Sequence, residues 1–194
     1  MGKRLTDLSD EALMRGVREG NADNVGALFE RHHARVHALC YRLTRRADEA
    51  DDLTQETFLR VLRYSSSYRQ EASFTTWLYR IAYNLCAELW QQTRRELPMP
   101  DEAERAESTG PAQLSERHVL LDEAMHRLEP EQRAVLVLTR YHDLKYDDVA
   151  RVLECTPAAA RVRAHRALND LKEIYRELEQ RRHDLRTSPR GNRR

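Results

Sequence analysis

The sequence predicts an all-α protein made of two small helical domains joined by an extended acidic linker. Apolar side chains recur at intervals of three and four residues along most of the chain, which is the period of an α-helix. Charged residues make up 34% of the 194 residues, and only 6 are Gly and 6 are Pro. This composition favours helices over sheets and argues against disorder throughout. We expect one domain over 1–95 and a second over 115–178.

Four helices are expected in the first domain, marked by caps and apolar stripes. Ser9 is a candidate N-cap for the first helix, and Gly20 ends it. Ser73 caps the fourth helix, after a polar loop over 65–71. The four helices are expected at about 10–19, 25–43, 48–64 and 74–95.

The segment 96–114 interrupts the helical pattern. It holds Pro98, Pro100, Gly110 and Pro111, and five acidic residues stand there against the single basic residue Arg105. We interpret it as an acidic, mostly extended linker. Beyond it, helices are expected near 115–128, 130–141, 146–153 and 157–178, followed by a basic, disordered tail over 179–194.

The second domain carries a helix-turn-helix pattern. A short amphipathic helix over 146–153 has an acidic first turn, and a tight turn over 154–156 follows it. Thr156 can cap the next helix, with Pro157 at its first position. That helix carries side chains suited to binding guanine edges and phosphates in the major groove: Arg161, Arg163, His165 and Arg166. Of Arg161 and Arg163, we expect one to contact bases and the other to contact phosphates. An ordinary helical hairpin with a solvated basic face is the alternative.

The third helix presents an acidic stripe that contains one apolar residue. Its members lie at i, i+3, i+4 and i+7, which places them on one face: Asp52, Gln55, Glu56 and Leu59. A neighbouring face is expected to pack inward through Leu53, Thr57 and Val61. The stripe is either a solvated surface or a docking patch for a basic partner helix.

The fourth helix and the loop before it mix aromatic and basic residues. Single-stranded DNA binds such surfaces, because unstacked bases stack on rings while cations hold the backbone. Phe74, Trp77, Leu78 and Ile81 are expected in the core, with Tyr83, Asn84 and the arginine pair 94–95 facing outward. The candidate DNA-binding residues are Tyr68, Arg69, Arg80, Tyr83, Asn84, Arg94 and Arg95.

Other features exclude several classes of protein. The three cysteines form no CxxC pair, so a disulfide framework is not expected and a reducing cytoplasm is the natural compartment. No apolar run is long enough to span a membrane. His33, His37 and Cys40 share a helical face that could hold a metal, but a half-buried core position is favoured. Neither a catalytic constellation nor a cofactor or metal site is predicted, so an enzyme is not expected.

Three segments together resemble the extracytoplasmic-function (ECF) group of the sigma-70 family of bacterial RNA polymerase sigma factors. Residues 50–61 resemble the polymerase-binding helix, 74–85 the promoter-melting helix, and 128–133 with 146–166 the upstream-element helix-turn-helix. The likeness covers residues 25 to about 175. Tyr83 stands where Arg is usual, Gln91 and Gln92 replace part of a usual basic run, and Ala158–Ala160 replace a usual Gly-Thr-Val, which puts the promoter preference in doubt.

The resemblance implies a role for each surface. Asp52, Gln55 and Glu56 would bind the clamp helices of the largest polymerase subunit, and the flap of the core enzyme is a further expected contact. The loop 65–71 would hold a base flipped from the minus-10 element, Asn84 would assist melting, and the linker would thread near the RNA exit. The basic helix would contact the minus-35 element. A stress or envelope-response regulon and an anti-sigma partner are also expected.

A free-standing helix-turn-helix regulator is the alternative function. Such a protein needs no acidic docking helix and commonly binds a palindrome as a dimer. The two readings differ in whether the chain associates with core polymerase.

Overall fold

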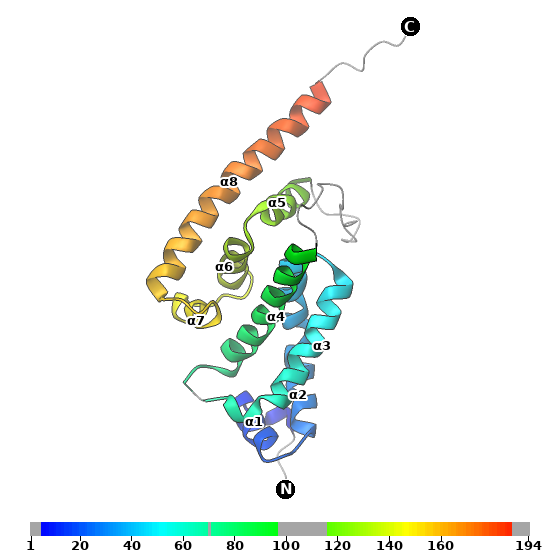
Figure 1. The fold of residues 1–194 in the computed structure, drawn as a ribbon, viewed down its shortest axis with the longest axis vertical. Coiled ribbons are helices and arrows are strands. Elements are labelled where there is room, and N and C mark those ends of the chain that lie inside the picture. The colour runs from blue at the N-terminus through cyan, green and yellow to red at the C-terminus, as the bar shows by residue number, and fades with distance from the viewer. Residues whose placement is uncertain (1–4, 70, 97–115, 188–194) are drawn as a thin grey trace.

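The structure of the protein is a computed structural model, which describes residues 5–69, 71–96 and 116–187 (Figure 1). Helices joined by short turns and loops make up these ranges. No strand occurs in those ranges, which confirms the predicted all-α fold. Apart from Glu96, the predicted linker over 96–114 lies outside the described residues. The elements are η1 (Leu5–Asp7), α1 (Asp10–Arg18), α2 (Asp23–Thr44), α3 (Ala47–Arg63), η2 (Ser65–Ser67), α4 (Phe74–Glu96), α5 (Glu116–Arg127), α6 (Pro130–Arg140), α7 (Tyr146–Val152) and α8 (Pro157–Thr187).

Three predicted caps are confirmed. The Ser9 hydroxyl accepts a hydrogen bond from the Ala12 amide at 3.2 Å, which satisfies an N–H that the first turn of α1 would otherwise leave unpaired. Ser73 does the same for α4, accepting from the amide three residues later at 3.2 Å. Thr156 accepts from the Ala159 amide at 3.1 Å at the start of α8.

The helices α1 to α4 form the first half of the molecule. A short connection joins α2 to α3, and Arg45 within it adopts a left-handed φ of 64° while its amide donates to the Tyr41 carbonyl. The two helices therefore pack side by side, with α4 against both. The centre of this half is made of fully buried apolar side chains from all four helices, among them Leu13, Leu28, Leu39, Val61 and Leu78.

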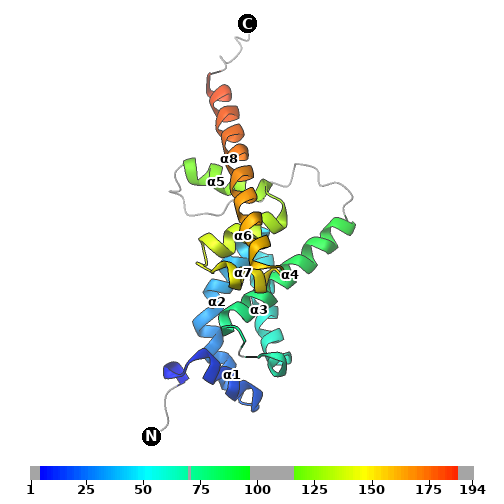
Figure 2. The ribbon, with the colours of Figure 1, turned by 90° about the vertical axis from the view of Figure 1, so that its left-hand side faces the viewer.

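The second half consists of α5 to α8, in which α5, α6 and α7 all pack on α8. The predicted end of the last helix at 178 is wrong, because α8 continues to Thr187 and projects beyond the rest of the molecule (Figures 1 and 2). Leu171, Ile174 and Leu178 carry an apolar stripe only as far as the predicted end, and the side chains of 179–184 are exposed. The helix continues there because Glu, Gln and Arg are good helix formers, which the Arg-rich composition was not taken to indicate. Residues 188–194 of the predicted tail lie outside the described residues.

The two halves pack against each other and share one core, with α4 against α7 and α2 against α6 (Figure 1). Arg133 of α6 lies buried at this contact. Its guanidinium donates to the Leu43 carbonyl at the end of α2 at 2.7 Å, and to Met125, His126 and Leu128 carbonyls of its own half at 2.7–3.1 Å. One buried cation therefore satisfies orphan carbonyls from both halves.

Candidate functional site

The predicted acidic stripe on α3 is exposed at three of its four positions. Asp52 and Gln55 face solvent, and the Leu59 residue is 52% exposed. Glu56 is half-buried, and it accepts from Arg60 at 3.1 Å. Arg60 also binds both oxygens of Glu88 on α4, at 2.9 and 2.8 Å. This ion-pair network holds the Glu56 carboxylate, so Glu56 is less exposed than the other members of the stripe.

The predicted inward face of α3 is buried as expected, through Leu53, Thr57 and Val61. Beside the acidic stripe, α2 and α3 form a mostly apolar groove of about 470 Å³. Leu62, which the sequence reading missed, is 42% exposed there although it is a large aliphatic residue. Its place at i+3 from Leu59 is the signal that could have identified it. The groove is lined by Val25, Gly26, Phe29, Glu30, Gln55, Phe58, Leu59 and Leu62.

The loop before α4 differs from the prediction at Tyr68, which is only 3% exposed. Its ring packs against Phe74 at 6.1 Å and Trp77 at 5.2 Å between centroids, and its hydroxyl donates to the Ala72 carbonyl at 3.5 Å. Burial raises the pKa of the Tyr68 phenol. Tyr68 supports the loop from beneath, so its ring offers no free face for a base.

The predicted polar residues of α4 line a cavity of about 780 Å³ that α7 helps to enclose. Arg80 and Asn84 of α4 lie there with Arg69 of the loop. On the far side, Glu154 of the helix-turn-helix turn accepts from the Arg80 Nε at 3.0 Å. The Thr76 hydroxyl of α4 also donates to a carboxylate of α7 at 3.3 Å. The second half of the molecule therefore covers the groove that was predicted to face DNA.

Tyr83 does not face outward as predicted. The residue is half-buried, and its ring meets Trp90 edge-on at 6.2 Å. Burial raises the pKa of Tyr83 to about 12, and the charges of Glu131 and Arg163 also act on it. The ring thus lies near the contact between the halves. Arg94 and Arg95 belong to the last turn of α4, but their side chains lie outside what the structure describes.

The basic helix α8 presents one continuous exposed face in its first turns. Arg161 lies over the Tyr146 ring, 5.5 Å from its centroid. Val162 was not predicted from the sequence; it is 50% exposed and lies beside Arg161 on this face. Six exposed residues lie on this face, because they are spaced at i, i+3, i+4, i+7, i+8 and i+11 along the helix: Ala158, Arg161, Val162, His165, Arg166 and Asn169.

Two predicted residues of the helix-turn-helix lie off this face. Arg163 is half-buried on the opposite side of α8, where it pairs with Glu131 of α6 at 3.1 Å. Thr156 uses its hydroxyl to cap α8. Of the two arginines expected to divide base and phosphate contacts, only Arg161 stands on this exposed face, while Arg163 is paired with Glu131.

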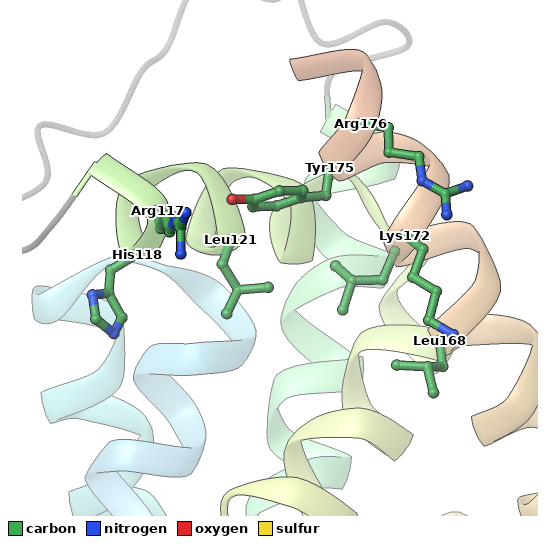
Figure 3. A pocket seen from close by; sticks show the side chains of 8 residues that line it. Arg117, His118, Leu121, Leu168, Lys172, Tyr175 and Arg176 are labelled. Carbon is green, nitrogen blue, oxygen red and sulfur yellow. The ribbon is translucent and has the colours of Figure 1, made fainter. Parts of the chain in front are cut away.

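A pocket of about 560 Å³ lies between α5 and α8, and Tyr175 reaches across it from α8 toward Leu121 of α5 (Figure 3). Its floor is apolar and consists of Leu121, Leu168, Leu171 and Tyr175. Its rim is basic and consists of Arg117, His118, Lys172 and Arg176. Such a pocket suits an amphipathic helix with acidic flanks.

The histidines and thiols of α2 have partners of their own. His33 stacks on Phe29 at 4.9 Å, and His37 pairs with Asp51 at 3.2 Å. Cys40 is fully buried beside Cys86, whose thiol pKa is raised by the Cys40 contact and by burial. Within the described ranges, no group of three metal-ligating side chains occurs. No helix in those ranges is both long and apolar enough to cross a bilayer.

Comparison with known protein families identifies a family match in each half of the molecule. Residues 28–96 match the model of Sigma-70 region 2, and 118–171 match that of Sigma-70, region 4. The ECF RNA polymerase sigma factor SigE of Mycolicibacterium smegmatis is 33% identical over 177 residues, covering 85% of this chain and 68% of SigE. The chain belongs to the ECF group of sigma-70 family sigma factors.

Other relatives extend the likeness over most of this ECF sigma factor. The RNA polymerase sigma factor CarQ of Myxococcus xanthus is 32% identical over 174 residues, covering 86% of this chain and 97% of CarQ. CnrH, solved with the cytosolic domain of CnrY, has a TM-score of 0.65 at 23% identity, covering 85% of this chain and 96% of CnrH. RpoE of Bartonella quintana was solved with the anti-sigma factor NepR; it has a TM-score of 0.61 at 21% identity, covering 76% of this chain and 94% of the RpoE chain.

The family fixes the general activity. As an ECF sigma factor, the protein directs RNA polymerase to promoters and has no catalytic activity of its own. A free-standing regulator is excluded, because the first half matches a sigma region that such a regulator does not need.

Proposed function

We propose that three separate surfaces of this ECF sigma factor divide the work of promoter recognition. The α2–α3 groove and its acidic stripe dock on core polymerase, the loop and α4 hold opened minus-10 DNA, and the exposed face of α8 contacts the minus-35 element. The observation that carries the docking part of the proposal is the pair of exposed leucines on α3, Leu59 and Leu62, with the exposed Asp52 two turns from Leu59 on the same helix. Large apolar side chains rimmed by charge on a monomer surface mark a protein interface.

The docking surface fits a basic partner helix. Leu59 and Leu62 supply apolar area, and Asp52 with Gln55 and Glu56 supplies the polar rim. The clamp helices of the largest polymerase subunit are the proposed partner. For the flap of the core enzyme we propose the α5–α8 pocket, whose apolar floor and basic rim form a second docking concavity.

The minus-10 surface combines cations and polar groups on both sides of the loop. Arg69 and Arg80 are proposed to hold phosphates, and Asn84 lines the same cavity. Arg80 is engaged by Glu154 in the structure, so a phosphate competes with this carboxylate for the guanidinium, and separation of α7 from α4 would free it for DNA. We therefore propose that the two halves open during promoter binding.

The minus-35 surface is the exposed face at the start of α8. Arg161 and Arg166 can donate to guanine edges or phosphates, and Val162 can contact a thymine methyl group in the major groove. His165 and Asn169 add hydrogen-bonding groups one turn further on.

For the regulatory context, we propose a stress or envelope-response regulon and an anti-sigma partner. The support is that RpoE, which shares this fold, was solved with the anti-sigma factor NepR. A partner of this kind would act on the same docking concavities.

Transcription with core polymerase on a library of genomic fragments tests the proposal. Wild type should start transcripts at a defined subset of fragments. Leu59→Asp should abolish both co-elution with core enzyme and transcription. Val162→Asp is the matched control, because it puts the same charge at an equally exposed aliphatic position on α8. It should keep co-elution and lose minus-35-dependent transcription, whereas normal activity of Leu59→Asp would overturn the docking assignment.

A further inference from the structure

Three arginines from two separate segments surround a second concavity, on the other side of the minus-10 loop. Arg15 and Arg18 come from the last turn of α1, and Arg69 comes from the loop that precedes α4. Ser66 and Tyr68 complete the lining of this space of about 570 Å³. Its walls are mostly polar, so it does not suit an apolar ligand.

These cations form no ion pair in the part of the chain that the structure describes, although the nearby carboxylates Glu11 and Asp10 act on Tyr68, which lines the concavity. Among the residues that the structure describes, no carboxylate lies within ion-pair distance of Arg15, Arg18 or Arg69. By contrast, Arg31 nearby on α2 is paired with Asp10. Like charges that converge on one concavity repel each other, and an anion bound between them removes that cost. A guanidinium cluster with no internal partner is therefore ready to bind a phosphate.

The position of the concavity points to the source of that phosphate. Arg69 lines both this space and the minus-10 cavity, and Ser66 and Ser67 of η2 lie one on each side. A single strand whose base enters the minus-10 cavity can therefore carry its backbone past Arg69, which lines both spaces, toward α1.

We propose that Arg15 and Arg18 form a phosphate site that extends the single-stranded DNA path beyond the minus-10 cavity. The inference rests on the proposed role of the loop in holding opened DNA. It adds α1, which lies outside the segment 28–96 that matches the family model, to the DNA-binding surface. Contacts of this kind position the strand without reading its sequence.

The site is open in the structure. Its lining comes only from α1, η2 and the loop, whereas Glu154 and Arg151 of the second half help to enclose the minus-10 cavity. The free chain should therefore use the α1 site even while its two halves are in contact, which allows a test without polymerase.

The experiment measures fluorescence anisotropy of a labelled (dT)20 strand with the full chain over a series of salt concentrations. Each phosphate contact contributes about 0.7 to the slope of log K against log salt for single strands. The double variant Arg15→Ala with Arg18→Ala should flatten the slope by about 0.7 to 1.4. Arg181→Ala with Arg182→Ala removes the same charge from an exposed part of α8 and should leave the slope unchanged.

Several outcomes overturn the proposal. It fails if wild type does not bind (dT)20, if the α1 variant keeps the wild-type slope, or if the α8 control flattens it equally. Inorganic phosphate at constant ionic strength provides a competition test: millimolar phosphate should weaken strand binding by wild type more than by the α1 variant, and equal competition in both would place the anion elsewhere and overturn the proposal. Co-elution of the α1 variant with core polymerase reports that it remains folded. Because the strand-binding assay contains no polymerase, its failure is distinct from failure of the library transcription test.

Discussion

Replacing Glu154 by Gln should shift the two halves of this sigma factor toward separation. The substitution removes the carboxylate that holds Arg80, while the side chain keeps nearly the same size. Both side chains are about half exposed, at 49% and 56%, so solvent screens the pair. We expect a loss of about 0.2–1 kcal/mol of closure free energy. This corresponds to an increase of roughly 1.4- to 5-fold in the ratio of open to closed molecules.

The same position allows a variant that separates closure from folding. Glu154 has a left-handed φ of 51°, which costs an L-residue about 1–2 kcal/mol and which Gly adopts freely. Glu154→Gly should therefore open the molecule as much as Glu154→Gln does, and yet raise the thermal stability of the helix-turn-helix half.

Energy transfer between dyes measures the opening directly. Glu19 follows α1 and Gln180 belongs to α8, and both are exposed. In Figure 1, α1 and the end of α8 lie at opposite ends of the molecule. Transfer efficiency should fall in both Glu154 variants. In the Arg80→Ala background, Glu154→Gln should add little, because the pair is already broken. An effect of full size in that background would refute the role given to this ion pair.

Three further predictions concern other parts of the structure. Burial lowers the pKa of His142 to about 4, so the unfolded chain binds more protons below pH 6.5. His142→Gln should accordingly reduce the fall in urea stability between pH 7 and 5, and a difference from wild type that is independent of pH would contradict this. Arg133→Met should lower the free energy of unfolding by about 3–5 kcal/mol, because carbonyls of both halves lose their buried partner, whereas exposed Arg127→Met should change it by less than about 1 kcal/mol. Arg161→Ala should weaken binding to a minus-35 duplex by about 1–3 kcal/mol, measured by anisotropy, whereas Arg163→Ala should have little effect; equal losses would contradict the assigned face of α8.

Local features of this protein were predictable from sequence. The caps at Ser9, Ser73 and Thr156 each bond an amide three residues along, so their chemistry is contained in four consecutive residues. Helical periodicity likewise placed Leu53 and Val61 inside, because burial on one side of a helix follows the period of 3.6.

Features that depend on distant partners were not predictable. Tyr68 looked like a stacking platform until α4 placed Phe74 beneath it. Arg163 looked free for DNA, but Glu131 lies 32 positions earlier in the chain and pairs with it. Periodicity assigns a residue to a helical face without revealing which neighbour covers that face. The contact of Arg80 with the opposite half arises in the same way, and its partner is 74 positions away.

The length of α8 has a mechanical consequence. At 31 residues it is about 46 Å long, a single continuous rod that begins at the proposed minus-35 face and ends beyond the body of the protein. Tyr175 in the pocket and Arg166 on that face are about 14 Å apart along its axis, with no proline or glycine between them to act as a joint. If the proposed face binds DNA, a partner held in the pocket would set the angle at which its arginines meet the duplex.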